Sequence, residues 1–176
     1  MPLFFKMTIN KTLAKKINIL AEKDQQIRKQ AEKNKAWDKK IDISNTKEMK
    51  KIIENYGWPI ISLVGEKASR NAWLLVQHAD YDKKFQKYCL NLMEKIYRHN
   101  PKDIQKENIA YLKDRVLINQ GKKQLFGTQF RFNKKQQLIP YPIRDKKNLE
   151  KNREEYDLPP FKDFLIMAKN YNKSIS

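Results

Sequence analysis

The 176-residue sequence contains one cysteine, two histidines and four glycines, and it has no long uninterrupted apolar segment. The single cysteine, Cys89, excludes an intramolecular disulfide, and its place in an apolar helical pattern predicts a packing role rather than a nucleophilic one. No apolar segment approaches the roughly 20 residues that a transmembrane helix needs. The apolar segment at the N-terminus is too short for a signal peptide. These absences predict a soluble cytoplasmic protein.

The shortage of histidine and cysteine also limits the metal chemistry that the chain can support. A zinc site would need carboxylates for most of its ligands, which is uncommon for zinc. Mg²⁺ or Mn²⁺ could be held by oxygen ligands, and the candidates are Asp24, Asp80, Asp82 and Asp114. No spacing among these aspartates matches a metal-binding motif, so the sequence assigns no metal ligand and leaves the cofactor unknown. The absence of a Gly-x-Ser-x-Gly segment and of a glycine-rich phosphate loop argues against serine hydrolases and nucleoside triphosphatases.

The formal net charge is +18, and 31 of the 38 basic residues are lysine. Arginine is usually the more frequent basic residue in a surface that has evolved to bind phosphate. Here lysine predominates, and the excess positive charge is spread along the chain. Two interpretations stay open: a solvated lysine surface that reflects residue usage, or a working basic patch. Both predict weak, salt-dependent adsorption to nucleic acid or to anionic membranes.

Hydrophobic periodicity predicts a mostly α-helical (α+β) protein that forms one domain over residues 1–176, with mobile ends at 1–7 and 172–176. About six helices are expected to surround a central buried helix at 64–79, because that segment is apolar on nearly every side. The period then changes, and two short apolar segments predict one small antiparallel β-hairpin at 124–143. The remaining helices are predicted at 8–35, 46–56, 83–98, 103–119, 149–156 and from Pro159 onward.

The helix predicted at 8–35 carries a carboxylate in the middle of its apolar stripe. At about 100° per residue, Asp24 lies on the same line as Leu13 and Ile17, and Arg28 follows one turn later. A buried carboxylate costs free energy unless it is paired. Asp24 therefore either pairs with Arg28 to lock the packing or faces a polar cavity, where Gln25 and Arg28 would also contact a ligand.

A second polar group follows the predicted central helix, where Gln77, His78 and Asp80 end an apolar segment. Histidine is the residue type that titrates near neutrality, so His78 is the candidate acid–base group. A carboxylate such as Asp24 or Asp114 would complete an acid–base pair. The alternative is that His78 only caps the end of the helix.

The segment around Gly127 supplies a third polar set. A glycine inside a predicted strand indicates a bulge or the close approach of another group to the backbone. The polar side chains around it, with Arg115, would donate hydrogen bonds to an anionic or carbonyl-bearing substrate. The predicted catalytic residues are therefore His78, Asp24 and Asp114. The predicted ligand-binding residues are Gln25, Arg28, Gln77, Asp80, Arg115, Gln124, Thr128 and Gln129.

Most of these residues lie in motifs that recur, in the same order, in a widespread bacterial family of unknown function. The chain resembles that family over roughly residues 20–165. The motifs stand here as Asp24-Gln25-x-x-Arg28, Gly57-Trp58-Pro59, Val64-Gly65, Trp73-Leu74-x-x-Gln77-His78-Ala79-Asp80, Ala110-Tyr111-Leu112-x-Asp114-Arg115-Val116 and Gln124-x-Phe126-Gly127-Thr128-Gln129. The chain departs from the family pattern at Phe126, where tyrosine is usual, and at Asp157, which replaces a glycine. The resemblance implies that the shared polar residues form one site, and it implies no particular activity.

Three functional classes follow from these observations. The leading hypothesis is a hydrolase or transferase with an acid–base pocket of His78, Asp24 and Asp114, acting on a small polar, phosphorylated or glycosyl-bearing substrate. The second class is a nucleotide- or nucleic-acid-binding module without catalysis. The third is an immunity-type protein-interaction domain in which the polar network fixes the fold. The expected partner in the first class is a small polar or anionic ligand.

Overall fold

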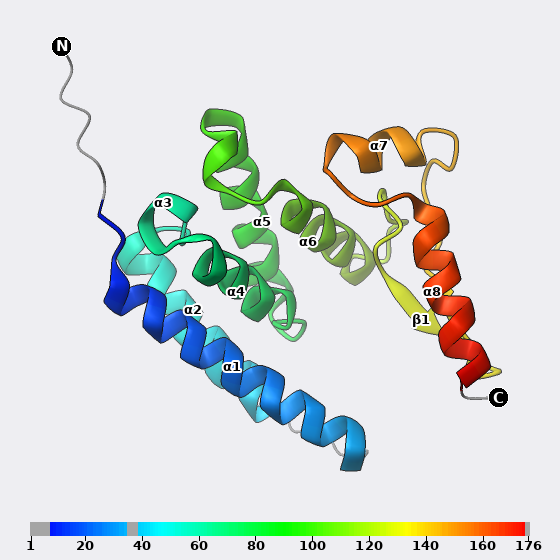
Figure 1. The fold of residues 1–176 in the computed structure, drawn as a ribbon, viewed down its shortest axis with the longest axis horizontal. Helices are drawn as coiled ribbons and strands as arrows, with labels where there is room; N and C mark the ends of the chain where they lie inside the picture. Colours follow the sequence, from blue (N-terminus) through cyan, green and yellow to red (C-terminus); the bar gives the residue numbers. More distant parts are fainter. Residues whose placement is uncertain (1–7, 35–38, 175–176) are drawn as a thin grey trace. The chain divides into compact units, whose positions relative to one another are not determined.

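The computed structural model describes residues 8–34 and 39–174, and the chain divides into two compact units, unit 1 (residues 1–105) and unit 2 (residues 106–176). The described residues contain eight α-helices, one 3₁₀ helix and a two-stranded antiparallel sheet (Figure 1). The prediction of a mostly α-helical fold with one small hairpin is therefore confirmed. The single domain over residues 1–176 stays a prediction.

Unit 1 contains five α-helices and the 3₁₀ helix, namely α1 (Lys11–Asn34), α2 (Lys40–Tyr56), α3 (Ile61–Val64), α4 (Glu66–Gln77), α5 (Lys83–His99) and η1 (Pro101–Asp103). Helix α4 contacts α1, α2, α3 and α5, and it corresponds to the predicted central helix. Ala72 and Val76 of α4 are both 0% exposed, as expected for a helix covered on several sides. It begins later than predicted because Gly65, with a positive φ of 81°, separates it from α3.

The packing of α1 against α2 follows from their apolar stripes. Leu13 and Ile17 are buried on α1, and Asp24 continues the same buried line, as the sequence predicts. Helix α2 begins at Lys40 rather than at the predicted residue 46, because its buried stripe already begins at Ile41. This earlier start adds more than one helical turn to α2, and that turn contributes to the candidate site.

Unit 2 contains α6 (Lys106–Asn119), β1 (Phe130–Phe132), β2 (Leu138–Pro140), α7 (Leu149–Glu155) and α8 (Phe161–Ser174). Strands β1 and β2 pair antiparallel, with Phe130 opposite Pro140 and Phe132 opposite Leu138. Helix α8 packs against β2 and against α7. The two strands lie inside the predicted 124–143 segment, and both are shorter than that prediction implies.

The first part of the predicted hairpin, residues 124–129, is a loop. Gly127 in this loop has a positive φ of 69°, which favours glycine over residues with a side chain. A Cβ atom at this position would lie 2.6 Å from Cε2 of Phe161. The close approach that the glycine predicted is therefore present, and it is made by an aromatic ring of α8.

Among the residues that the structure describes, every helix is too short or too polar to span a membrane. The predicted mobile end at 1–7 lies outside the described residues. At the other end, residues 172–174 belong to α8, and residues 175–176 lie outside the described part of the chain.

Candidate active site

Asp24 is the centre of a polar cluster in unit 1. Its side chain is 0% exposed, on the buried stripe of α1. Gln25 donates a hydrogen bond to Oδ2 of Asp24 over 2.9 Å, and Asn45 of α2 donates to Oδ1 over 3.2 Å. Arg28, one turn further along α1, donates from Nε to Oδ2 over 3.0 Å. The Asp24–Arg28 pair that the helical spacing predicts is therefore present.

Arg28 also joins α1 to the first turn of α2. Its Nη2 donates a short hydrogen bond to Oδ1 of Asp42 and lies 3.4 Å from Oδ1 of Asp24. One guanidinium thus bridges two carboxylates, as its planar set of donors allows. Asp42 is absent from the predicted site because α2 was expected to begin at residue 46. The spacing Asp42-x-x-Asn45, which puts both side chains on one helix face, is the signal that points to it.

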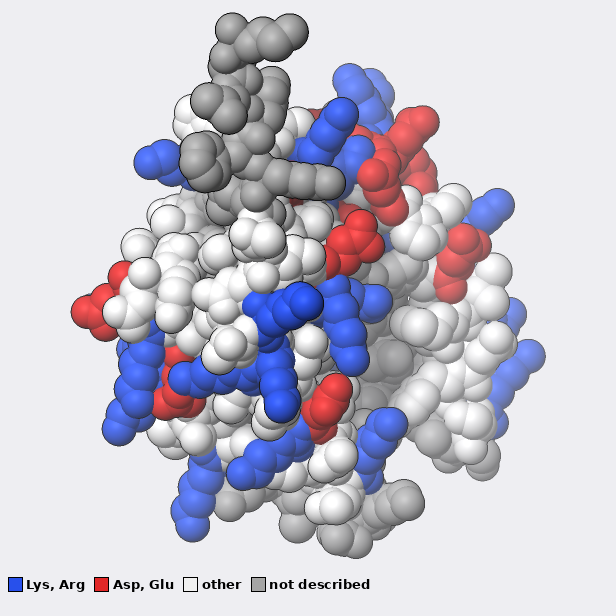
Figure 2. Space-filling model, turned by 60° about the vertical axis from the view of Figure 1, so that its left-hand side comes forward, with Lys and Arg blue, Asp and Glu red and all other residues white. Residues whose placement is uncertain are grey.

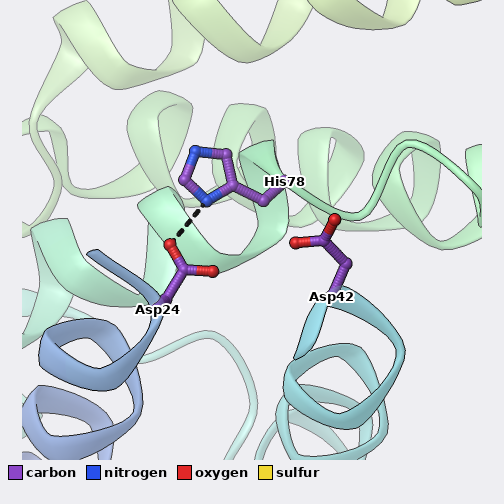
Figure 3. A group of neighbouring side chains, drawn as sticks. All are labelled: Asp24, Asp42 and His78. Carbon is purple, nitrogen blue, oxygen red and sulfur yellow. Dashed lines mark hydrogen bonds and ion pairs between the residues drawn. The ribbon is translucent and has the colours of Figure 1, made fainter. Parts of the chain in front are cut away.

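His78 reaches Asp24 from the end of α4. It is the C-cap residue of α4, and its Nδ1 lies 2.9 Å from Oδ2 of Asp24. The side chain of His78 is 16% exposed, whereas the side chain of Asp24 is fully buried. In Figure 3 the second ring nitrogen points away from both Asp24 and Asp42. The imidazole is thus held at one nitrogen by a buried carboxylate, and its other nitrogen is directed elsewhere. We call Asp24, Gln25, Arg28, Asp42, Asn45 and His78 the Asp24 cluster.

The charges in the Asp24 cluster favour the ionised carboxylate. Burial alone would raise the pKa of Asp24, but hydrogen bonds from His78 and Arg28, together with their positive charges, lower it from 3.8 to about 2. Asp24 is therefore ionised at neutral pH. With Asp42 included, the cluster contains two carboxylates and one guanidinium, so it carries negative charge whenever the imidazole is neutral.

The same cluster brings together side chains that can ligate a metal ion. Asp24, Asp42 and His78 each offer one ligand atom, and these atoms lie within 4.8 Å of one another. Figure 3 shows them converging from α1, α2 and the end of α4. Two carboxylate oxygens and one imidazole nitrogen form a donor set that divalent ions such as Mn²⁺, Co²⁺ and Zn²⁺ accept.

The other predicted residues of unit 1 build the end of α4. Gln86 of α5 is 0% exposed, and its Nε2 donates to the backbone oxygens of Val76 and Gln77 and to Oδ1 of Asp80. This amide caps the last carbonyl groups of α4. Oε1 of Gln77 is buried without a hydrogen-bond partner among the described residues. Gln77 and Asp80 therefore belong to the helix end that positions His78.

In unit 2, Asp114 of α6 holds the loop at 124–129. Its carboxylate is 0% exposed and accepts hydrogen bonds from the backbone N–H groups of Leu125 (2.7 Å), Phe126 (3.1 Å) and Thr128 (3.0 Å). The hydroxyl of Thr128 donates a further bond of 3.0 Å. Burial raises the pKa of Asp114, although these hydrogen bonds from Thr128, Leu125 and Phe126 oppose the shift. Each of these donors is uncharged.

The side-chain amide of Gln124 makes the hydrogen bonds to backbone groups that a peptide group of a neighbouring strand would make. Its Oε1 accepts a hydrogen bond from the N–H of Gln129 over 2.9 Å, and its Nε2 donates to the backbone oxygens of Gln129 and Tyr141. Arg115 donates from Nη1 to Oε1 of Gln129 over 3.1 Å. The polar side chains around Gly127 therefore stabilise the loop, which is sufficient reason for their presence.

Arg153 of α7 is a fully buried cation in unit 2 that the sequence did not predict. Its Nε donates to the backbone oxygen of Pro159 over 2.7 Å, and its Nη1 donates a short bond to the backbone oxygen of Phe126. The guanidinium lies 4.4 Å from the ring centroid of Phe164, a favourable cation–π distance. Burial lowers the pKa of Arg153. The charged residues next to it in the sequence give no sign of this burial.

The structure gathers the predicted residues into two groups. The group in unit 1 contains Asp24, Gln25, Arg28 and His78, with Gln77 and Asp80 at the adjoining helix end. The group in unit 2 contains Asp114, Arg115, Gln124, Thr128 and Gln129. One pocket that joins His78 and Asp24 with Asp114 stays a prediction.

The fold and the two groups define a small, mostly α-helical protein whose N-terminal unit holds a partly buried Asp–Arg–His network. The chain belongs to a family of unknown function, DUF6624, whose family model matches residues 11–173. The predicted membership in a family without an assigned activity is thereby confirmed. The comparison with curated proteins gave no match, and the comparison with solved structures gave none either.

Proposed function

We propose that this protein is an acid–base enzyme, a hydrolase or transferase, in which His78 transfers the proton and Asp24 orients its ring. The observation that carries the proposal is the 2.9 Å contact between Nδ1 of His78 and Oδ2 of Asp24. The carboxylate is fully buried and the imidazole is partly exposed. A histidine that is backed by a buried carboxylate and reaches solvent is the arrangement that hydrolases use for proton transfer.

The two ring nitrogens of His78 would have separate roles. Nδ1–H donates to the ionised Asp24, which selects one tautomer and leaves the lone pair on Nε2. Nε2 then accepts a proton from water or from a substrate hydroxyl as that oxygen attacks, and it returns the proton to the leaving group. The charge of Asp24 stabilises the imidazolium between these steps. Cys89 is not the nucleophile, because it is buried and burial raises its pKa.

Arg28 limits the substrates that this centre suits. The sequence predicts that Arg28 grips a polar substrate, phosphorylated or glycosyl-bearing, but its guanidinium bridges Asp24 and Asp42. Asp24 and Asp42 place two carboxylates close to His78, and a carboxylate repels an anion. We therefore favour a neutral polar substrate, such as a glycosyl compound, over a phosphorylated one.

The charge distribution gives less support to a nucleic-acid-binding module. Figure 2 shows Lys and Arg side chains spread over one face of the molecule, with Asp and Glu side chains between them. Lys16 and Lys51 both pair with Glu48 at 2.8 Å, and Lys50 pairs with Asp82 at 2.6 Å. Such pairs reduce the uncompensated charge that a phosphate backbone would neutralise. We keep nucleic-acid adsorption as a weak, salt-dependent property and not as the function.

The test is a turnover screen of metal-free protein against chromogenic glycosides, phosphate esters and carboxylic esters. His78→Gln is the test variant. His99→Gln is the matched control, because His99 is the second histidine of the sequence and is exposed at the end of α5. We expect turnover of glycosides, a loss of about 10²- to 10⁴-fold in kcat for His78→Gln, and no change for His99→Gln.

Each other outcome of the screen rejects a defined part of the proposal. Equal turnover by the wild type and by folded His78→Gln would remove His78 from the mechanism. Turnover of phosphate esters alone would keep the acid–base centre and reject the neutral substrate. No turnover of any class would reject the enzyme and favour the interaction-domain alternative.

A further inference from the structure

The Asp24 cluster contains three side chains that converge as metal ligands would. One ligand atom from each of Asp24, Asp42 and His78 lies within 4.8 Å of the other two, and Figure 3 shows the three side chains directed toward a common region. They come from separate elements, α1, α2 and the end of α4, so their meeting results from the fold and not from adjacency in sequence.

The separation between two of these atoms already matches that of neighbouring ligands on one ion. Nδ1 of His78 and Oδ2 of Asp24 are 2.9 Å apart. Two atoms bound at about 2.1 Å to the same ion and at right angles to each other are about 3 Å apart. An ion could thus replace the proton that these two atoms share, and Asp42, whose ligand atom lies within 4.8 Å of the other two, would move closer to become the third ligand.

The local charge also favours a cation. In a chain with a net charge of +18, this cluster has two carboxylates against one guanidinium. A dication would neutralise the remaining negative charge, and Arg28 could keep its hydrogen bonds to both carboxylates as an outer donor that orients the ligands. The imidazole nitrogen suits Zn²⁺, Co²⁺ or Mn²⁺ better than Mg²⁺ or Ca²⁺, which prefer oxygen ligands.

We propose that Asp24, Asp42 and His78 form a binding site for one divalent transition-metal ion. The site shares its side chains with the proposed acid–base centre and rests on that location, but not on its catalytic role. The ion takes the lone pair of Nδ1, so the single proton of the neutral imidazole resides on Nε2, and Asp24 changes from hydrogen-bond acceptor to ligand. The ion-bound state and the proton-transferring state therefore exclude each other, and the ion inhibits proton transfer by His78.

The test is calorimetric titration of the metal-free protein with Zn²⁺ and with Co²⁺. We expect one ion per chain and a loss of affinity of roughly tenfold or more for Asp42→Asn. Asp82→Asn is the matched control, since Asp82 is another carboxylate of unit 1 in an ion pair, with Lys50 at 2.6 Å. It also caps α5 by accepting from the N–H of Phe85, and asparagine caps a helix equally well.

Nitrogen NMR of the two imidazoles gives a second readout that does not depend on Asp42→Asn folding correctly. Zn²⁺ should shift the Nδ1 resonance of His78 and leave the resonances of His99 unchanged. Unchanged affinity in both Asp42→Asn and His78→Gln, or a shift of His99 alone, would overturn the metal site. The absence of binding to the wild type would overturn it as well.

Activity separates this inference from the proposed function. Turnover in chelator that Zn²⁺ abolishes would support both. Turnover without any metal binding would support the acid–base centre and reject the metal site. Metal binding at His78 without turnover in chelator would support the metal site and reject the acid–base proposal.

Discussion

Asp24 in unit 1 and Asp114 in unit 2 are both aspartates with no exposed surface, but their hydrogen-bond partners differ in kind. Asp24 accepts from side chains of α1, α2 and the end of α4, and Arg28 and His78 among them are basic. Asp114 accepts from backbone N–H groups of one loop and from the hydroxyl of Thr128. The partners of Asp24 thus include two basic side chains, whereas every partner of Asp114 is uncharged.

The pKa values follow from this difference. Burial acts on both carboxyl groups, but only Asp24 has basic partners that outweigh it, so its pKa falls to about 2 while the pKa of Asp114 rises. Asp24 is coupled to a partly exposed imidazole, and Asp114 is coupled to a backbone segment. Burial of a carboxyl group therefore does not by itself set the direction of its pKa shift, which depends on the chemical nature of its partners.

The largest effect is expected for Asp114→Ala. The substitution leaves the N–H groups of Leu125, Phe126 and Thr128 without their acceptor, and each buried donor that loses its partner costs about 1–3 kcal/mol. We expect the free energy of unfolding, measured by urea denaturation, to fall by roughly 3–5 kcal/mol. The exposed Asp163 supplies the control Asp163→Asn, which should have little effect. A loss below about 1 kcal/mol for Asp114→Ala would reject its architectural role.

A comparison of Gly127→Ala with Gly121→Ala tests how closely the loop at 124–129 packs against the ring of Phe161. Both glycines have positive φ, 69° and 72°, so alanine costs roughly 1–2 kcal/mol at either position. At Gly127 the new Cβ also meets the ring of Phe161 at 2.6 Å, whereas at Gly121 no atom lies within 4 Å. We expect Gly127→Ala to lose about 1–2 kcal/mol more than Gly121→Ala. Equal losses would show that the ring moves aside freely.

The pH dependence of the stability of Asp24→Asn tests the effect of the basic partners of Asp24. Because the folded pKa of about 2 lies below the ordinary 3.8, the ionised form stabilises the fold. That contribution is complete above about pH 4 and is lost as the pH falls through 2. The wild type should exceed Asp24→Asn by about 2 kcal/mol at pH 7. Urea denaturation at each pH should show this difference shrinking toward pH 2.

Asp114 should show the opposite pH dependence, because its folded pKa is raised. The protonated form is then favoured in the folded state, so the contribution of Asp114 to stability grows as the pH falls toward 3.8 and declines as the pH rises. The difference between the wild type and Asp114→Asn should follow that trend. Parallel pH profiles for Asp24→Asn and Asp114→Asn would contradict the contrast between the two carboxyl groups.

The smallest effect on stability is expected for His78→Gln. The imidazole is partly exposed, and Asp24 keeps the hydrogen bonds from Gln25, Arg28 and Asn45. We expect the free energy of unfolding to fall by less than about 1 kcal/mol, as thermal or urea unfolding would measure. A loss as large as that of Asp114→Ala would place His78 among the architectural residues.

Features that depend on neighbouring residues were predictable from the sequence. The pairing of Asp24 with Arg28 follows from their helical spacing. Gly57 ends α2 with a φ of 71°, and Asp82 caps α5, because glycine and aspartate have these preferences locally. The close approach of another group to Gly127 was also predictable, although the sequence did not identify that group as Phe161.

Features that depend on distant residues were not predictable. Asp42 meets Arg28 only because α2 starts early enough to place it against α1. Asn45 is buried inside α2 and donates to Asp24. Arg153 finds its acceptors on residues that its own helix does not contain. Periodicity specifies which face of a helix is buried, but not which polar group will lie opposite.

The cap that Gln86 places on α4 has a consequence for the ageing of the protein. Its amide nitrogen donates to three oxygens, from Val76, Gln77 and Asp80. Hydrolysis of this amide would put a carboxylate where a donor is needed, facing three acceptors at once. The end of α4 would open, and His78 would lose its position. Because the side chain of Gln86 is 0% exposed, the fold shields this amide from the water that would hydrolyse it, whereas the amide of the exposed Gln120 lacks that protection.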